Sequence, residues 1–110
     1  FLDIEGHSTL QLESAMKLWW VHVEAQYALV NAHLRTREGK WLEWLERVQE
    51  WTWAHFPDHQ HGEWYGYLDR QGTPALTLKG GNYKGCFHIP RALLFSLQQI
   101  RAAGERSRQA

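Results

Sequence analysis

The chain has 110 residues, no net charge (12 Lys and Arg against 12 Asp and Glu) and a single cysteine. Its length fits one small domain or a piece of a larger one, and a hydrophobic content of 44% argues against a disordered chain. The balanced charge argues against a nucleic-acid binder, and one cysteine cannot form an internal disulfide. We find no apolar run long enough to cross a bilayer and no signal-peptide pattern. Because the first residue is Phe1 rather than methionine, we expect a processed, truncated or excerpted chain.

Tryptophan is unusually frequent, with seven in so short a chain. Tryptophan is rarely buried completely, and a core of this size has difficulty hiding seven indole rings. The tryptophans therefore either line a ligand site or pack against structure that this chain does not contain.

Two helices are predicted in the first half of the chain. Residues 13–35 lack Gly and Pro, and their apolar residues recur at helical spacing on more than one side. Residues 40–56 form the second helix, which Pro57 ends. The turn at residues 36–39 is so short that we expect an antiparallel helical hairpin. The apolar stripe of the second helix consists of Trp41, Trp44, Val48, Trp51 and His55.

The period of the pattern changes after the second helix. Residues 63–69 alternate in the manner of a strand, residues 70–74 form a turn, and residues 75–78 form a short return strand. These segments predict one short β-hairpin. Residues 1–12 are predicted as a short extended piece and a loop.

The end of the chain predicts a Gly-rich loop followed by a third helix. The loop covers residues 79–85, Pro90 suits the first helical position, and Gly104 ends the helix before a frayed polar tail. The sequence thus predicts a mainly α chain of three helices with one short β-hairpin. This architecture does not close a core on its own.

Glu24 is the first candidate functional residue. It shares a helical face with Trp20 and Tyr27, and a carboxylate between aromatic rings is costly to bury unless it is paired. One interpretation is a sugar site, where aromatic faces stack on the sugar and a carboxylate binds its hydroxyls. The other, slightly favoured by spacing alone, is a partly exposed glutamate at a helix edge. His22 lies on the opposite side of the helix and is interpreted as a packing residue.

His88 is the second candidate, because it stands just before the helix that Pro90 starts. Histidine changes charge near neutral pH and can act as an acid or a base. Arg91 could hold an anionic intermediate or pair with a carboxylate. A histidine that merely packs or forms a hydrogen bond at the helix start is an equally good interpretation of the spacing.

Two further patterns are weaker. A metal site at His55, His59 and His61, with Cys86 as a fourth ligand, straddles Pro57 and lacks the paired spacing of structural zinc sites, so a polar surface turn is favoured. The loop at residues 79–85 lacks the lysine and hydroxyl residue that complete a phosphate-binding P-loop. Cys86 is interpreted as a small packing residue.

Three blocks of the sequence carry a resemblance to a known family. The first block is KLWWVHVEA at residues 17–25, and the second is GEWYGYLD at residues 62–69. The third is LKGG at residues 78–81, which continues into KGCFHIPR at residues 84–91. In residues, order and spacing these blocks resemble the C-terminal part of enzymes of the N-acylglucosamine 2-epimerase family.

The resemblance implies a fold and an activity. It implies that residues 1–110 are a C-terminal fragment of a single (α/α)6-barrel domain, in which six helical hairpins form two rings. The reaction it implies interconverts N-acetylglucosamine and N-acetylmannosamine by removal and return of the proton at C2 of the open-chain sugar. We therefore expect an isomerase of carbohydrate metabolism that binds an amino sugar, with no metal, cofactor, nucleic acid or membrane involved. A cytoplasmic location is expected, and a homodimer is left open.

The resemblance also assigns site residues. His88 matches one of two histidines that share the acid and base work, and Glu24 matches a carboxylate of the site. Trp20 and Trp64 are expected to wall the site, and Arg91 to support substrate binding. The second histidine has no counterpart here, so we expect the fragment alone to be inactive.

Two alternatives remain at this stage. One is a different reaction on the same barrel, either the isomerisation of mannose to a ketose or the 2-epimerisation of cellobiose. The other is a non-catalytic module that binds proteins through its aromatic surface.

Overall fold

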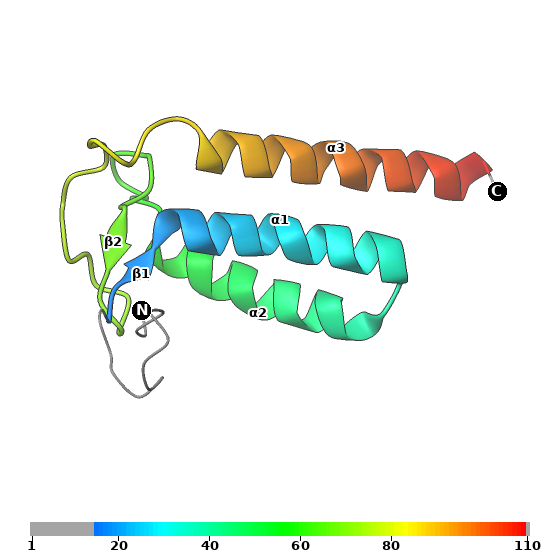
Figure 1. Ribbon diagram of the computed structural model, residues 1–110, viewed down its shortest axis with the longest axis horizontal. Helices are drawn as coiled ribbons and strands as arrows, with labels where there is room; N and C mark the ends of the chain where they lie inside the picture. The colour runs from blue at the N-terminus through cyan, green and yellow to red at the C-terminus, as the bar shows by residue number, and fades with distance from the viewer. Residues whose placement is uncertain (1–14, 110) are drawn as a thin grey trace, which may run out of the picture.

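The computed structural model describes residues 15–109, so the prediction for residues 1–12 lies outside the described residues. In chain order the elements are β1 (Lys17–Leu18), α1 (Trp19–Thr36), α2 (Gly39–His55), β2 (Tyr67–Leu68) and α3 (His88–Gln109) (Figure 1). The described part of the chain is mainly helical, with the three helices that the sequence predicts. None of its helices is long and apolar enough to span a membrane.

Helices α1 and α2 form the predicted antiparallel hairpin (Figure 1). Arg37 ends α1 in the left-handed conformation (φ 62°), and its N–H donates to the carbonyl of His33 at 2.8 Å. This cap reverses the chain within the short turn. The predicted start of α1 was wrong in its described part, because residues 15 and 16 are not helical and residues 17–18 form a strand.

The partner of β2 is β1, rather than the predicted return strand at residues 75–78. Lys17 and Leu18 pair antiparallel with Leu68 and Tyr67. Residues 75–78 form no strand, and a single bridge between Leu68 and Pro74 is what remains of the predicted hairpin. The return segment does meet β2 on the edge opposite β1, where the N–H of Ala75 donates to the Tyr67 carbonyl at 2.8 Å, but the pairing does not continue into a strand.

Helix α3 lies beside α1 and runs in the same direction, so both helices begin at the end of the molecule that carries the strands (Figure 1). It starts two residues before Pro90 and continues through Gly104 to Gln109. The prediction that Gly104 ends the helix was therefore wrong. A single glycine costs a helix only about 1 kcal/mol, which the flanking helix-forming residues offset.

The core lies where α1, α3 and the strands meet. We call this set the aromatic core, and its buried members are Trp19, Val23, Phe56, Trp64, Leu68 and Ala92. Phe56 and Trp64 stack with ring centroids 5.7 Å apart, and the Trp19 ring meets Tyr67 edge-on at 5.4 Å. Farther along α3 the apolar side chains of Leu94, Leu97 and Ile100 are exposed. The described helices thus leave apolar surface uncovered, as the predicted incomplete architecture implies.

Candidate functional site

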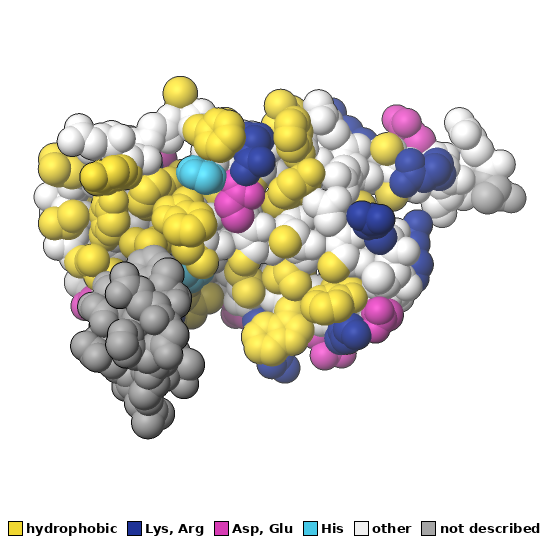
Figure 2. All heavy atoms as spheres, viewed as in Figure 1, with side chains coloured by type: hydrophobic (Ala, Val, Ile, Leu, Met, Phe, Trp, Pro, Cys, Tyr) yellow, Lys and Arg dark blue, Asp and Glu magenta, His cyan; other side chains and the backbone are white. Residues whose placement is uncertain are grey.

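Glu24, His88 and Arg91 meet where α1 and α3 run side by side, and we call them the charged cluster. Nδ1 of His88 lies 2.8 Å from Oε1 of Glu24. Nη2 of Arg91 donates to the same carboxylate oxygen. Cyan, magenta and dark blue side chains meet on the corresponding face in Figure 2. Residues that are 64 positions apart in the sequence therefore form one hydrogen-bonded unit.

The local structure explains this meeting. Glu24 and Trp20 are four residues apart, so they lie one above the other on α1. His88 and Arg91 are three residues apart and share a face in the same way on α3. Because α1 and α3 are parallel neighbours, the two pairs face each other across the contact between the helices.

The electrostatics of the cluster keep Glu24 ionised. Partial burial alone would raise the pKa of Glu24, but the hydrogen bonds from His88 and Arg91 outweigh burial and hold its pKa below the ordinary value. The three side chains keep between a quarter and a third of their surface exposed. A buried Nε–H of Arg91 has no hydrogen-bond partner among the described residues. The cluster is thus charged and partly open to solvent, and one of its hydrogen-bond donors has no partner among the described residues.

Aromatic rings flank His88 on two sides. The Trp20 ring lies 5.9 Å from the imidazole at an interplanar angle of 36°. Phe87 meets the imidazole edge-on at 5.0 Å, and the Arg91 guanidinium lies over the Phe87 ring at 4.8 Å. Phe87 was not singled out by the sequence, although its place directly before His88 was the available signal. Flat apolar faces beside hydrogen-bonding groups suit a sugar, which presents both C–H faces and hydroxyls.

Trp64 is the predicted wall residue that the structure does not bring to the cluster. It retains 5% of its surface and stacks on Phe56, with the Trp53 ring edge-on at 5.2 Å. An indole held in this way braces the aromatic core beneath the site. The backbone bridge between Trp64 and Pro57 explains the placement, because it holds Trp64 beside Phe56, the residue before Pro57.

Two other histidines, His22 and His55, take structural positions. His22 bonds the Leu18 carbonyl at 2.8 Å and stacks on Trp51, and burial lowers its pKa. This arrangement confirms its interpretation as a packing residue. His55 stacks on Trp51 with centroids 4.2 Å apart. Within residues 15–109 we find no group of three His, Cys, Asp or Glu side chains placed to hold a metal ion.

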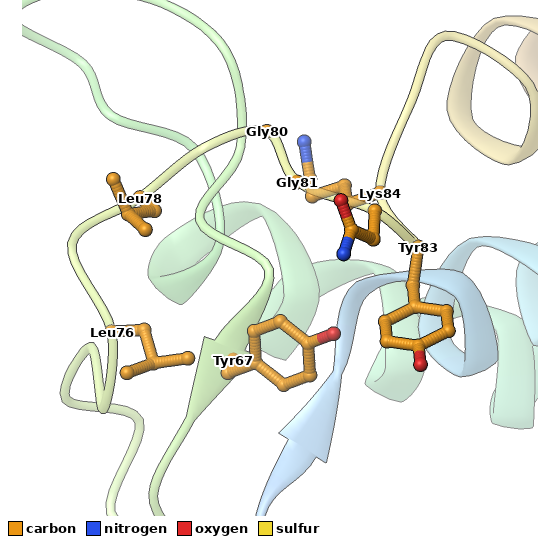
Figure 3. A pocket seen from close by; sticks show the side chains of 8 residues that line it. Tyr67, Leu76, Leu78, Gly80, Gly81, Tyr83 and Lys84 are labelled. Atoms are coloured by element: carbon orange, nitrogen blue, oxygen red, sulfur yellow. The ribbon is translucent and has the colours of Figure 1, made fainter.

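The Gly-rich loop lines a pocket of about 140 Å³. It is also held by hydrogen bonds that the sequence did not reveal. Figure 3 shows Tyr67, Leu76, Leu78 and Tyr83 around the pocket, with the loop glycines above them. Asp58 anchors the start of the loop by accepting hydrogen bonds from Lys79 and from the Tyr65 hydroxyl. The hydrogen bond from Lys79 is the main reason why the pKa of Asp58 lies well below its ordinary value.

The arrangement of the helices is that of part of an (α/α)6 barrel, which confirms the predicted architecture. The structure of cellobiose 2-epimerase from Spirochaeta thermophila matches with a TM-score of 0.72 and 31% identity, over 79% of this chain and 22% of that one. A crystal structure of D-mannose isomerase matches with a TM-score of 0.72 and 25% identity, over 76% of this chain and 21% of that one. The class defined by the fold is therefore that of helical barrels related to sugar epimerases and isomerases.

The sequence comparisons place the chain within that class. The model of the family described as N-acylglucosamine 2-epimerase (GlcNAc 2-epimerase) matches residues 2–92. The N-acylglucosamine 2-epimerase of Bos taurus is 48% identical over 93 residues, covering 84% of this chain and 22% of the relative. The enzyme of Homo sapiens is 42% identical over 102 residues, covering 93% and 24%. The chain belongs to the N-acylglucosamine 2-epimerase family, and it spans about a quarter of the length of the curated relatives it matches.

Proposed function

We propose that this chain is the C-terminal part of a sugar 2-epimerase that interconverts N-acetylglucosamine and N-acetylmannosamine. The observation that carries the proposal is the hydrogen bond from His88 to Glu24, with Arg91 on the same oxygen. The names of the relatives from Bos taurus and Homo sapiens support the choice of an N-acylated amino sugar. Residues 1–110 would then form one sector of a single barrel domain.

His88 is the proposed acid and base at C2. Glu24 is an acceptor when ionised, so its contact with Nδ1 favours the tautomer that carries the proton on Nδ1. Nε2 then has a lone pair that can take the C2 proton of an open-chain sugar. The electrons of the broken C–H bond move into the adjacent carbonyl and form an enolate, which a proton returned to the other face of C2 converts to the epimer.

Arg91 and Trp20 have supporting roles in this proposal. The Arg91 guanidinium pairs with Glu24 and keeps about a third of its side-chain surface exposed, so its positive charge can help to stabilise the negative charge that develops on the substrate oxygen. The exposed face of Trp20 beside His88 offers a stacking surface for the sugar. The second acid or base for the opposite face of C2 lies outside this chain in our proposal, so residues 1–110 alone are expected to be inactive.

The test uses the full-length protein in D2O with N-acetylmannosamine, and NMR follows both epimer formation and deuterium incorporation at C2. We expect the His88→Gln variant to lose both, because the amide cannot accept the proton. His59→Gln is the matched control, since His59 is exposed on a loop, and it should retain full activity. Undiminished C2 exchange in His88→Gln would remove His88 from the mechanism.

The same assay separates the enzyme alternatives. Mannose and cellobiose are supplied in parallel, because the solved structures that resemble this chain include a D-mannose isomerase and cellobiose 2-epimerases. A preference for either of these sugars would replace the amino-sugar assignment while keeping the roles of His88 and Glu24. No conversion of any of the three would favour the protein-binding module.

We also propose a cytoplasmic location. The exposed thiol of Cys86 supports it, because a free surface cysteine is best tolerated in a reducing compartment. Fractionation of cells that express the full-length protein tests this, and recovery in a secreted fraction would contradict it.

A further inference from the structure

Lys84 is a buried lysine in the loop that leads into α3. It retains 5% of its surface and is the one buried lysine or arginine among residues 15–109. A buried ammonium group is costly unless it is paired and hydrogen-bonded. The mechanism proposed above makes no use of this side chain, so its burial calls for an explanation.

The stem of Lys84 passes through a narrow slot over Gly66. A Cβ atom at Gly66 would lie 3.1 Å from Cδ of Lys84 and 3.6 Å from Cε3 of Trp19. The backbone of Gly66 is also fixed to α1, because its carbonyl accepts the N–H of Trp19 at 3.1 Å. The stem therefore rests on the junction between β2 and the first residue of α1.

The ammonium group of Lys84 ties two segments together. It donates to Oε1 of Glu63 at 3.0 Å and to the carbonyl of Lys79 at 2.7 Å. The second bond closes the loop on itself, and in Figure 3 the Lys84 side chain runs back toward Gly80 and Gly81. The N–H of Gly81 also donates to the Lys84 carbonyl at 3.1 Å.

Glu63 is held in a strained conformation that serves this contact. Its φ of 62° is left-handed, which is unusual for a residue with a Cβ atom. Oε1 of Glu63 accepts both the Lys84 ammonium and the N–H of Trp64, the latter at 2.7 Å. Strain of this kind persists where the surroundings impose it, and such positions cluster near functional sites.

We call the contacts of the Lys84 ammonium group with Glu63 and Lys79 the Lys84 clamp. The position of Lys84 in the chain links this clamp to the charged cluster. Lys84 is four residues before His88, and the intervening residues 85–87 include the exposed Phe87 and Cys86. Trp19, which lines the slot, is directly followed by Trp20, which flanks His88. Lys84 therefore fixes the loop before His88 to the same backbone that presents Trp20.

We propose that Lys84, held by Glu63 over Gly66, is a positioning residue that sets the start of α3 and thereby the placement of His88 against Glu24. The proposal rests on the proposed function for its kinetic test. An error of about 1 Å in the placement of a catalytic group can cost on the order of 100-fold in rate. Lys84 itself touches neither His88 nor Glu24, so it acts through the loop.

The test compares steady-state kinetics of variants in the full-length protein. Lys84→Met keeps the apolar stem and removes the ammonium group, and we expect kcat to fall on the order of 10- to 100-fold with KM within about twofold. Glu63→Gln keeps the acceptor oxygen and should stay within about threefold of the parent kcat, whereas Glu63→Ala should fall as Lys84→Met does. Lys40→Met is the matched control, because the exposed Lys40 pairs with Glu38 at the far turn, and it should change neither constant.

A purely structural role for Lys84 predicts a different result. Lys84→Met would then lower the melting temperature while kcat per folded molecule stayed at the parent value, and that outcome overturns the proposal. A rise in KM without a fall in kcat also overturns it. If Lys84→Met does not fold, Gly66→Ala provides the second variant, because the added methyl group would press against the Lys84 stem at 3.1 Å and should lower kcat by shifting it.

Amide hydrogen exchange separates the failure of this inference from failure of the proposed function. Exchange at residues 85–88 should be faster in Lys84→Met than in the parent and unchanged in Lys40→Met. Unchanged exchange overturns the clamp even if His88→Gln is inactive. Faster exchange supports the clamp even if no sugar is converted.

Discussion

Trp19 and Trp20 are adjacent in the chain, yet they belong to two regions with opposite properties. Trp19 lies in the aromatic core with 3% of its surface exposed, whereas Trp20 stands beside the charged cluster with 37% exposed. The core residues gain free energy by losing contact with water. The cluster residues remain partly hydrated and are paired by charge. The comparison indicates that the core supplies stability and that the cluster is free to serve chemistry.

The largest expected effect compares a phenylalanine inside the aromatic core with one outside it. Phe56 is fully buried, so Phe56→Ala should lower the free energy of unfolding of the full-length protein by about 3–5 kcal/mol. Phe95 is 40% exposed and packs on Tyr27 along the α1–α3 contact, so Phe95→Ala should cost only about 1 kcal/mol. Urea unfolding measures both. Equal costs would show that the core does not dominate stability.

A second prediction concerns the turn that supports the core beneath α2. Gly72 has φ of 92°, and an added Cβ would collide with the ring of His55. That ring is held by stacking on Trp51 and by a bond to its carbonyl, so it cannot move away cheaply. We expect Gly72→Ala to cost about 1–3 kcal/mol in thermal or urea unfolding. Gly62→Ala is the control, because φ is also positive there but no atom lies within 4 Å of an added Cβ. If Gly62→Ala lowered the free energy of unfolding as much as Gly72→Ala, the contact with His55 would not be the cause of the loss.

The charged cluster should contribute less, and in a pH-dependent way. Because the folded pKa of Glu24 lies below the ordinary value of 4.5, the contribution is present above that pH and is lost as the pH falls through the folded pKa. Glu24→Gln should therefore cost about 1 kcal/mol near neutral pH, and the difference from the parent should shrink below pH 4.5. Urea unfolding at several pH values measures this. A difference that grows on acidification would contradict a lowered pKa for Glu24.

The smallest expected effect is a gain in stability on the exposed part of α3. Gly104 lies inside the helix with no neighbour near an added Cβ. Gly104→Ala should raise the free energy of unfolding by about 0.5–1 kcal/mol, because alanine loses less backbone entropy in a helix. Thermal melting checks this. A loss of stability would mean that Gly104 faces structure outside residues 15–109.

The local features of the sequence predicted the helices well and the long-range pairings poorly. The second helix was expected at residues 40–56 and lies at Gly39–His55, because apolar periodicity and Pro57 are local signals. The pairing of β1 with β2 joins residues far apart, and neither strand exceeds two residues, so no local pattern marked it. The predicted start of α1 was wrong for this reason. The predicted hairpin was wrong because the pairing with β2 that begins at Pro74 and Ala75 does not continue along residues 75–78.

The candidate site shows the same division. Spacing alone left Glu24 and His88 as open interpretations, and only their meeting across two helices makes them a pair. Trp64 shares a motif with the family, but its ring points into the core, and motif spacing carries no information on that direction. Lys84 gave no signal, since a lysine in a Gly-rich loop is ordinarily exposed, and only its slot over Gly66 sets it apart.

The separation of Glu24 from His88 along the chain has a consequence for the order of folding. The α1–α2 hairpin joins neighbours in the chain, so its contact order is low and it can form early. Glu24 and His88 are 64 positions apart, so their contact closes a long loop and costs more chain entropy than the contacts within the hairpin. The charged cluster should therefore assemble late, and pulse-labelled hydrogen exchange during refolding should protect α1 and α2 before residues 85–91. The candidate site would then be complete only in molecules in which residues 85–91 have also folded.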